Sequence, residues 1–124
     1  MFKHERLEVW QEAIQFVCEV YQKTKPFPSD ERFGLTNQVR RSSNSVAANI
    51  AEGCSRSTDR EYIRFLEIAY ASLAETVSHL EVSLRLNFLP SEDHKCLRER
   101  AERIGRMLSG LRTSLERSLS SPRP

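Results

Sequence analysis

Apolar residues recur at intervals of three and four along four separate stretches of the chain, and this repeat constrains the fold more than any other feature. Such spacing places the apolar side chains on one face of an α-helix. No stretch shows the period-two alternation, with turn residues at its ends, that is typical of strands. The breaks between the stretches are only a few residues long, so neighbouring helices must be antiparallel. We therefore predict an all-α fold, an antiparallel up-down-up-down four-helix bundle.

Local signals set the ends of the first two predicted helices. The first begins at Leu7 and ends before Pro26, because proline disfavours helical geometry in the residue that precedes it. The second begins near Ser29 or Asp30, either of which can cap a helix, and ends at Gly53. The apolar face of the second helix then continues regularly between these two ends.

The last two helices have equally clear signals. Thr58 and Glu61 have the spacing of a capping box, which predicts the start of the third helix. A break before Ser91 ends that helix, and Ser91 caps the fourth. We expect a single domain over residues 1–119 and a disordered C-terminal tail over residues 120–124.

The apolar faces also predict the core and, with the composition, exclude several classes of protein. Trp10, Tyr21 and Phe65 should be mostly buried. Three cysteines lie far apart, without a C-x-x-C pair, so neither a disulfide framework nor a cysteine zinc site is expected. No apolar run approaches the ~18 residues of a membrane span. These observations favour a reduced, cytoplasmic protein without membrane contact.

Tests for catalytic and metal sites are negative. A ferritin-like di-metal site needs Glu-x-x-His on two helices, whereas Glu75 and His79 are four apart and Glu92 and His94 are two apart. His4 stands alone near the N-terminus. No spacing links a nucleophile to a base and an orienting acid, and the glycines form no phosphate-binding loop. We expect no metal, no cofactor, no catalytic residue and no enzymatic activity.

A regular polar stripe is unusual for a bundle helix. On the second helix it comprises Gln38, Arg41, Ser45, Asn49 and Glu52, at spacings of three and four. A shorter polar row on the third helix comprises Ser72, Glu75 and His79. Folding the two helices together permits an Arg41–Glu75 or a Gln38–Ser72 contact. The stripe is interpreted first as a buried or interfacial polar network, with a solvated face and a ligand site as alternatives.

The arginines are the second candidate set. Arg40, Arg56, Arg60 and Arg64 are expected to gather at one end of the bundle, and Arg98, Arg103 and Arg106 lie mostly off the apolar face of the fourth helix. The net charge is only +2, so in one monomer a surface of ordinary ion pairs is favoured over a nucleic-acid footprint. A symmetric oligomer would copy each arginine and turn weak patches into one polyvalent surface.

Several motifs occur together in order and are specific. They are Trp10-Gln11, Phe33-Gly34-Leu35, Gln38-x-Arg40-Arg41, Asn49-Ile50-Ala51-Glu52-Gly53 and Phe65-Leu66. Over residues 5–90 the chain closely resembles the bacterial four-helix-bundle family of 23S rRNA intervening-sequence proteins, which looks related to the accessory variability determinant of diversity-generating retroelements. The fourth helix resembles that family in pattern only.

The resemblance implies a homo-oligomer, typically a homopentameric ring, whose basic surface contacts nucleic acid. The family's polar signature falls on Gln38, Arg40, Arg41, Ser45, Asn49, Glu52 and Glu75. We therefore expect a non-enzymatic cytoplasmic homo-oligomer that binds RNA or DNA through its arginines. The alternative is an oligomeric scaffold that binds a protein partner and no nucleic acid.

Overall fold

The computed structural model describes residues 1–120, which form four α-helices, two short 3-10 helices and no strand. The elements are η1 (Lys3–Arg6), α1 (Glu8–Thr24), η2 (Ser29–Glu31), α2 (Leu35–Cys54), α3 (Asp59–Arg85) and α4 (Ser91–Ser120). The all-α prediction with four helices is therefore confirmed. Of the expected tail, Ser120 belongs to α4, which corrects that boundary, and residues 121–124 lie outside the described residues.

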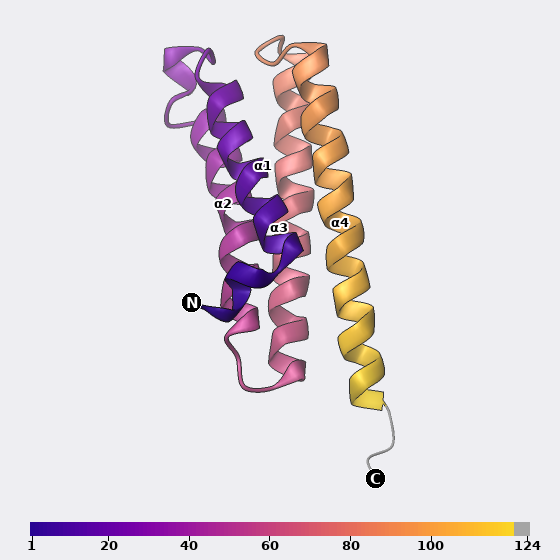
Figure 1. Cartoon of the computed structure of the whole chain (residues 1–124). Helices are drawn as coiled ribbons and strands as arrows, with labels where there is room; N and C mark the ends of the chain where they lie inside the picture. Colours follow the sequence, from indigo (N-terminus) through magenta and orange to yellow (C-terminus); the bar gives the residue numbers. More distant parts are fainter. Residues whose placement is uncertain (121–124) are drawn as a thin grey trace.

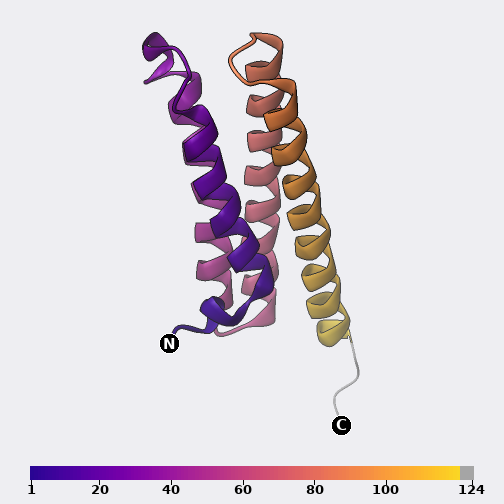
Figure 2. The ribbon, with the colours of Figure 1, turned by 45° about the horizontal axis from the view of Figure 1, so that its top comes forward.

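The four helices lie side by side, as Figure 1 shows. Both α1 and α3 pack against α2 and α4. The α1–α2 and α3–α4 connections are at one end of the molecule, and the α2–α3 connection is at the other (Figure 1). The tilted view in Figure 2 shows the same arrangement, with α4 ending at about the level of the α2–α3 turn. The outer side of the α2–α3 pair is thus not covered by any described helix.

The core consists largely of the apolar faces predicted from the sequence, to which the structure adds Phe16 of α1 and Leu89 of the α3–α4 connection. The largest fully buried apolar side chains are Phe16, Val20, Val39, Val46, Ile50, Leu66, Leu80, Leu89, Leu97, Ile104 and Leu108. They come from all four helices and from the α3–α4 connection. Burying a side chain of this size stabilises a fold by about 1.5–3 kcal/mol, so this shared core holds the helices together.

The predicted start of α2 was wrong. Ser29 and Asp30 lie in the short η2, and α2 begins at Leu35 after Gly34. The cap is instead the side chain of Glu31, whose Oε1 accepts a hydrogen bond of 3.1 Å from the backbone N–H of Leu35. A carboxylate beside the free N–H groups of a helix start is favourable, so the acid replaces the usual N-cap residue.

The other predicted boundaries agree with the structure to within one or two residues, except that Ser91 is the first residue of α4 and its side chain makes no capping hydrogen bond with a described residue. Thr58 is the N-cap of α3, and its Oγ1 accepts a hydrogen bond of 3.2 Å from the backbone N–H of Glu61. Beyond the end of α3, Asn87 adopts the left-handed conformation with φ of 64°. Asparagine tolerates this conformation better than most residues, which lets the chain turn toward α4.

The prediction of buried aromatic residues was wrong for Tyr21. Trp10 and Phe65 are half-buried, whereas Tyr21 is 39% exposed. The ring of Tyr21 lies 4.7 Å from the guanidinium carbon of Arg40, and its hydroxyl accepts a hydrogen bond from Asn44. The aromatic ring thus holds polar side chains of α2 at the surface instead of filling the core.

Candidate functional site

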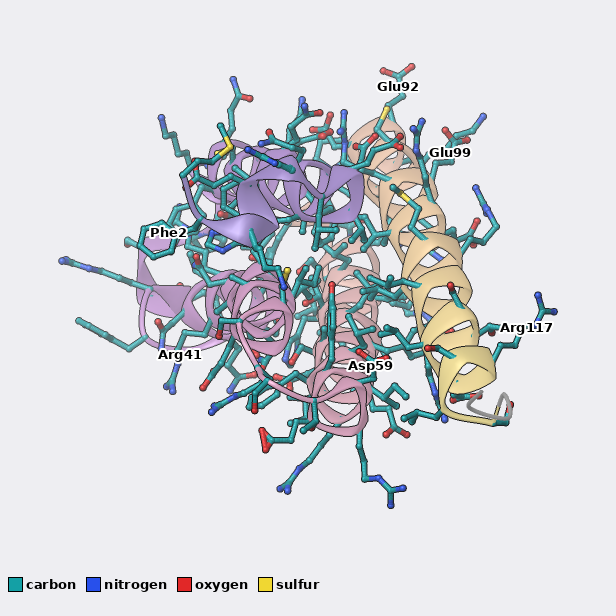
Figure 3. All side chains as sticks on the ribbon, turned by 60° about the horizontal axis from the view of Figure 1, so that its bottom comes forward. Phe2, Arg41, Asp59, Glu92, Glu99 and Arg117 are labelled. Carbon is teal, nitrogen blue, oxygen red and sulfur yellow. The ribbon has the colours of Figure 1, made fainter. Side chains whose placement is uncertain are left out.

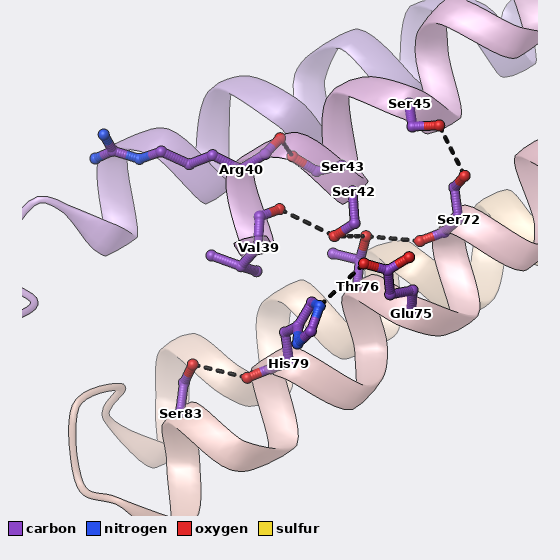
Figure 4. Close-up of polar contacts among 10 residues, drawn as sticks. All are labelled: Val39, Arg40, Ser42, Ser43, Ser45, Ser72, Glu75, Thr76, His79 and Ser83. Atoms are coloured by element: carbon purple, nitrogen blue, oxygen red, sulfur yellow. Dashed lines mark hydrogen bonds and ion pairs between the residues drawn. The ribbon is translucent and has the colours of Figure 1, made fainter. Parts of the chain in front are cut away.

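Serine and threonine hydroxyls join α2 to α3 along one polar seam (Figure 4). Ser42 and Thr76 meet at 2.7 Å between their Oγ atoms, and Ser45 and Ser72 meet at 2.8 Å one turn further along. Asn49 donates to the Ser45 hydroxyl at 3.0 Å. These contacts fix how α2 and α3 are aligned with each other.

The hydroxyls of the seam are satisfied locally as well as across it. Ser42 donates to the carbonyl of Val39 at 3.2 Å, and Ser43 donates to the carbonyl of Arg40 at 2.9 Å. Thr76 has the carbonyl of Ser72 at 2.8 Å as an alternative acceptor. A buried hydroxyl without a hydrogen-bond partner destabilises the folded state. Because these hydroxyls have partners on their own helix as well as on the neighbouring one, polar residues are tolerated between α2 and α3.

A polar hollow of about 460 Å³ opens outward from the seam. Its lining residues are Gln38, Arg41, Ser42 and Ser45 from α2, and Ser72, Glu75 and His79 from α3. The structure therefore brings the two polar rows together. The contact across them is Ser45–Ser72, and neither an Arg41–Glu75 nor a Gln38–Ser72 bond forms within residues 1–120.

The charges at the hollow are only partly compensated. Oε2 of Glu75 lies 3.1 Å from Nε2 of His79. Within the described chain, the side chains of Gln38 and Arg41 form no hydrogen bond or ion pair. Glu52, at the far end of the predicted stripe, pairs with Arg56 at 2.8 Å and does not line the hollow. An unpaired guanidinium and a partly free carboxylate thus face the same space.

Four of the seven candidate nucleic-acid arginines already have partners in the fold. Arg40 donates to Thr24 at 2.9 Å, and Arg56 pairs with Glu52 and lies over the ring of Phe65. Arg98 pairs with Glu102 at 3.1 Å. Arg103 lies 3.3 Å from Glu8 and 3.2 Å from Glu12.

The other three, Arg60, Arg64 and Arg106, are exposed and form no hydrogen bond or ion pair with another described residue. The expected cluster of four arginines at one end is incorrect, because Arg40 lies in the second turn of α2, near the end of α1. At ~1.5 Å of rise per residue, it is roughly 20 Å along the helix from the α2–α3 turn. Arg60 and Arg64 lie in the first turns of α3, beside that turn.

Comparison with known proteins supplies the family. The model of the 23S rRNA-intervening sequence protein family matches residues 5–110. The chain belongs to this family. A solved structure with a similar fold is a protein of unknown function from the S23 ribosomal protein family of Bacteroides thetaiotaomicron VPI-5482. The two are 23% identical, the TM-score is 0.79, and the match covers 85% of this chain and 95% of the other. No curated protein matches the chain.

In this 23S rRNA-intervening sequence protein, one well-placed arginine was not among the residues predicted from the sequence. Arg100 on α4 reaches three side chains of α1: Glu19 at 2.8 Å, Gln15 at 3.0 Å and Glu12 at 3.4 Å. The signal was present, because Glu12 and Glu19 are seven apart and share one face of α1. Arg100 thus links α4 to α1 through side-chain contacts.

In this protein, the pKa values of the Lys23 and Tyr62 side chains are shifted. A hydrogen bond and the charge of Asp93, 3.1 Å away, raise the pKa of Lys23, which links the ends of α1 and α4. Burial, followed by a hydrogen bond with Cys54, raises the pKa of Tyr62 at the opposite end. Both groups stay in their usual protonation states near neutral pH, so neither indicates acid–base chemistry.

Two kinds of feature are absent from the described part of this 23S rRNA-intervening sequence protein. Residues 1–120 contain no group of three or more histidine, cysteine or acidic residues arranged to hold a metal ion. None of the helices in that range has the length and apolar character needed to cross a membrane.

Proposed function

We propose that this protein is a non-enzymatic, cytoplasmic homo-oligomer that binds RNA or DNA through exposed arginines. The observation that carries the proposal is the set Arg60, Arg64 and Arg106, whose guanidinium groups have no partner among the described residues. Free guanidinium groups are suited to phosphate, which they contact in a planar, bidentate fashion. The family's name, which refers to insertions in 23S rRNA, supports nucleic acid as the partner.

We further propose that the four helices form an antiparallel up-down-up-down bundle, and that copies assemble into a ring, which the family resemblance implies to be a pentamer. Exposed apolar side chains on α3 support self-association: Ile68, Tyr70 and Val82 are 39%, 50% and 43% exposed. Ile68 and Val82 share one face of α3 and Tyr70 lies on another, and exposed apolar side chains of this kind are typical of interaction sites. Copying three free arginines around a ring would strengthen binding that one weakly charged chain cannot provide.

The decisive experiment is fluorescence anisotropy with labelled RNA and DNA across a salt series. We expect log K to fall linearly with log salt, because each phosphate contact releases counterions. The triple variant R60A/R64A/R106A should weaken binding and flatten the slope. The matched control K3Q/K25Q/K95Q removes the same charge from three exposed lysines and should have a smaller effect. Absence of binding by the unaltered protein at low salt would refute the proposal.

The oligomer has a separate test. The chain has a mass of 14.4 kDa, so light scattering coupled to size exclusion at micromolar concentration should give several times that value. A monomer in this measurement contradicts the ring, and leaves nucleic-acid binding to be judged by the salt series alone.

A protein-interaction scaffold is the second candidate, and a specific observation favours it. Phe33, in the turn before α2, is 85% exposed, and the only described group stacked on it is the guanidinium of Arg32, 5.3 Å from the ring centre. Exposed aromatic and arginine side chains are enriched in protein interfaces. A pull-down that recovers one protein and survives nuclease treatment would favour the scaffold, whereas loss of the partner after nuclease would favour nucleic acid.

A further inference from the structure

We propose that the polar hollow between α2 and α3 binds one nucleotide, with its phosphate on Arg41 and the edge of its base on Glu75. This inference rests on the proposed nucleic-acid binding and assigns a recognition role to residues other than the three free arginines above. The volume of about 460 Å³ falls within the ~300–1,000 Å³ range of small-molecule sites. A nucleotide presents both an anion and a hydrogen-bonding base, and the hollow has a group for each.

The floor of the hollow is rigid. Ser42 and Thr76 are buried, and their hydroxyls meet at 2.7 Å beneath the opening. Ser45 and Ser72 close one side through their 2.8 Å contact. A surface held by cross-helix hydrogen bonds does not need to be ordered on binding, which preserves affinity.

Arg41 suits the phosphate. It points outward from α2 (Figure 3), and all its donors are unused by the described residues. Gln38, one turn earlier on the same face, also has an uncommitted side chain that can donate and accept. A guanidinium without an acidic partner has no intramolecular bond to break before it binds an anion.

Glu75 suits the base. One carboxylate oxygen is occupied by His79 at 3.1 Å, and the other, Oε1, has no hydrogen-bond partner in residues 1–120. A carboxylate accepts hydrogen bonds from the exocyclic amino group of cytosine. It repels the carbonyl oxygen that uracil carries at the same ring position. Cytosine and uracil therefore form a matched pair of ligands that differ in the group Glu75 would read.

The test compares 12-nucleotide oligo-C and oligo-U by fluorescence anisotropy at one salt concentration. We expect the unaltered protein to prefer oligo-C by about tenfold, as one base contact typically provides. Glu75→Gln keeps the shape of the side chain but can donate as well as accept, so the preference should fall below about threefold. The control Glu99→Gln removes the charge of an exposed carboxylate on another side of the molecule (Figure 3) and should retain the preference.

A second variant tests the phosphate end. Arg41→Gln should weaken oligo-C and oligo-U equally and reduce the log–log salt slope by about 0.7, the value for one phosphate contact with a single strand. A merely structural Arg41 would change the thermal midpoint without changing the slope. Circular dichroism melting of every variant verifies that the fold is intact.

The results separate this inference from the proposed function. Equal binding of oligo-C and oligo-U, or a preference that survives Glu75→Gln, overturns the nucleotide site while strand binding stands. If no oligonucleotide binds, calorimetry with free cytidine and uridine monophosphates decides: cytidine-selective binding lost in Glu75→Gln supports the hollow as a site for free nucleotides. The proposed nucleic-acid binding has already failed in that case, and absence of nucleotide binding in the calorimetry overturns the hollow as a nucleotide site as well.

Discussion

Thr76 on α3 donates a hydrogen bond of 2.7 Å to Ser42 on α2, and both side chains are buried between the two helices. A buried bond between neutral hydroxyls contributes only about 0.5–1.5 kcal/mol to stability, and here each hydroxyl keeps a local carbonyl acceptor if its partner is removed. The pair is thus more important for how α2 and α3 align than for the total free energy of unfolding.

A double-mutant cycle checks the coupling of these hydroxyls. Thr76→Val and Ser42→Ala should each lower the free energy of unfolding by about 0.5–1.5 kcal/mol, the net value of the bond between them, because the remaining hydroxyl keeps its local carbonyl acceptor. The double variant should lose less than the sum, since neither hydroxyl then remains. Urea denaturation of the four proteins measures this. Strict additivity would mean that the two hydroxyls act independently.

Gly53→Ala should destabilise the protein by about 1–3 kcal/mol, although alanine is the better helix former. A Cβ atom at this position would lie 2.7 Å from Cβ of Phe65 and 3.3 Å from the carbonyl oxygen of Tyr62. The glycine therefore permits the close approach of α2 and α3.

The matched control for Gly53 is Gly110→Ala in α4, where an added Cβ has no neighbour within 4 Å. This substitution should raise stability by up to ~1 kcal/mol through helix propensity alone. Thermal unfolding of the two variants should give shifts of opposite sign. Equal shifts would contradict the close packing at Gly53.

Arg100→Ala should weaken the contact between α1 and α4. The guanidinium is one-third exposed and contacts Glu12, Gln15 and Glu19 together, so we expect a loss of about 1 kcal/mol. Arg100→Lys should recover only part of it, because an ammonium group cannot reach three partners in a plane. Chemical denaturation tests this ranking, and lysine performing as well as arginine would contradict it.

Glu81 should contribute to the free energy of unfolding near neutral pH and lose this contribution in acid. A hydrogen bond from Arg85 holds the pKa of Glu81 below its usual range, against an opposing effect of burial. A group with a lowered pKa in the folded state stabilises the fold above its unfolded pKa, and this contribution is lost as the pH falls through the folded value.

The comparison of unaltered protein with Glu81→Gln tests this sign. The difference in melting temperature should favour the unaltered protein at pH values above ~5, begin to shrink as the pH falls below the unfolded pKa of about 4.3, and vanish once the pH is below the lowered pKa of Glu81 in the folded protein. A difference that grows on acidification would show that the sign is wrong.

The course of the helices was predictable because their apolar spacing is strong, whereas two local details were not. Glu31 caps α2 from outside the helix, four residues before Leu35, and no standard N-cap pattern has this form. Tyr21 lies at the edge of its apolar face, where Arg40 offers its ring a partner at the surface. Periodicity indicates which face a residue shares, but not how deeply a residue at the edge is buried.

The candidate site was predictable in part. The two polar rows were visible in the sequence, and the hollow joins Gln38, Arg41, Ser72 and Glu75 as their spacing suggested. Which arginines stay free was not predictable, because it depends on acids far away in the chain, as with Arg103 and Glu8. Whether a given arginine has an acidic partner is decided by contacts between helices that are far apart in the sequence.

The hydroxyl contacts of α2 and α3 also bear on the exposed turn between them, residues 55–58. The side-chain contacts between α2 and α3 fix how far the two helices are shifted along each other. This alignment therefore does not depend on the length of the loop that connects them. The turn is therefore a permissive place for an insertion, such as a short epitope or a fluorophore attachment sequence, which would leave the polar hollow between α2 and α3 undisturbed.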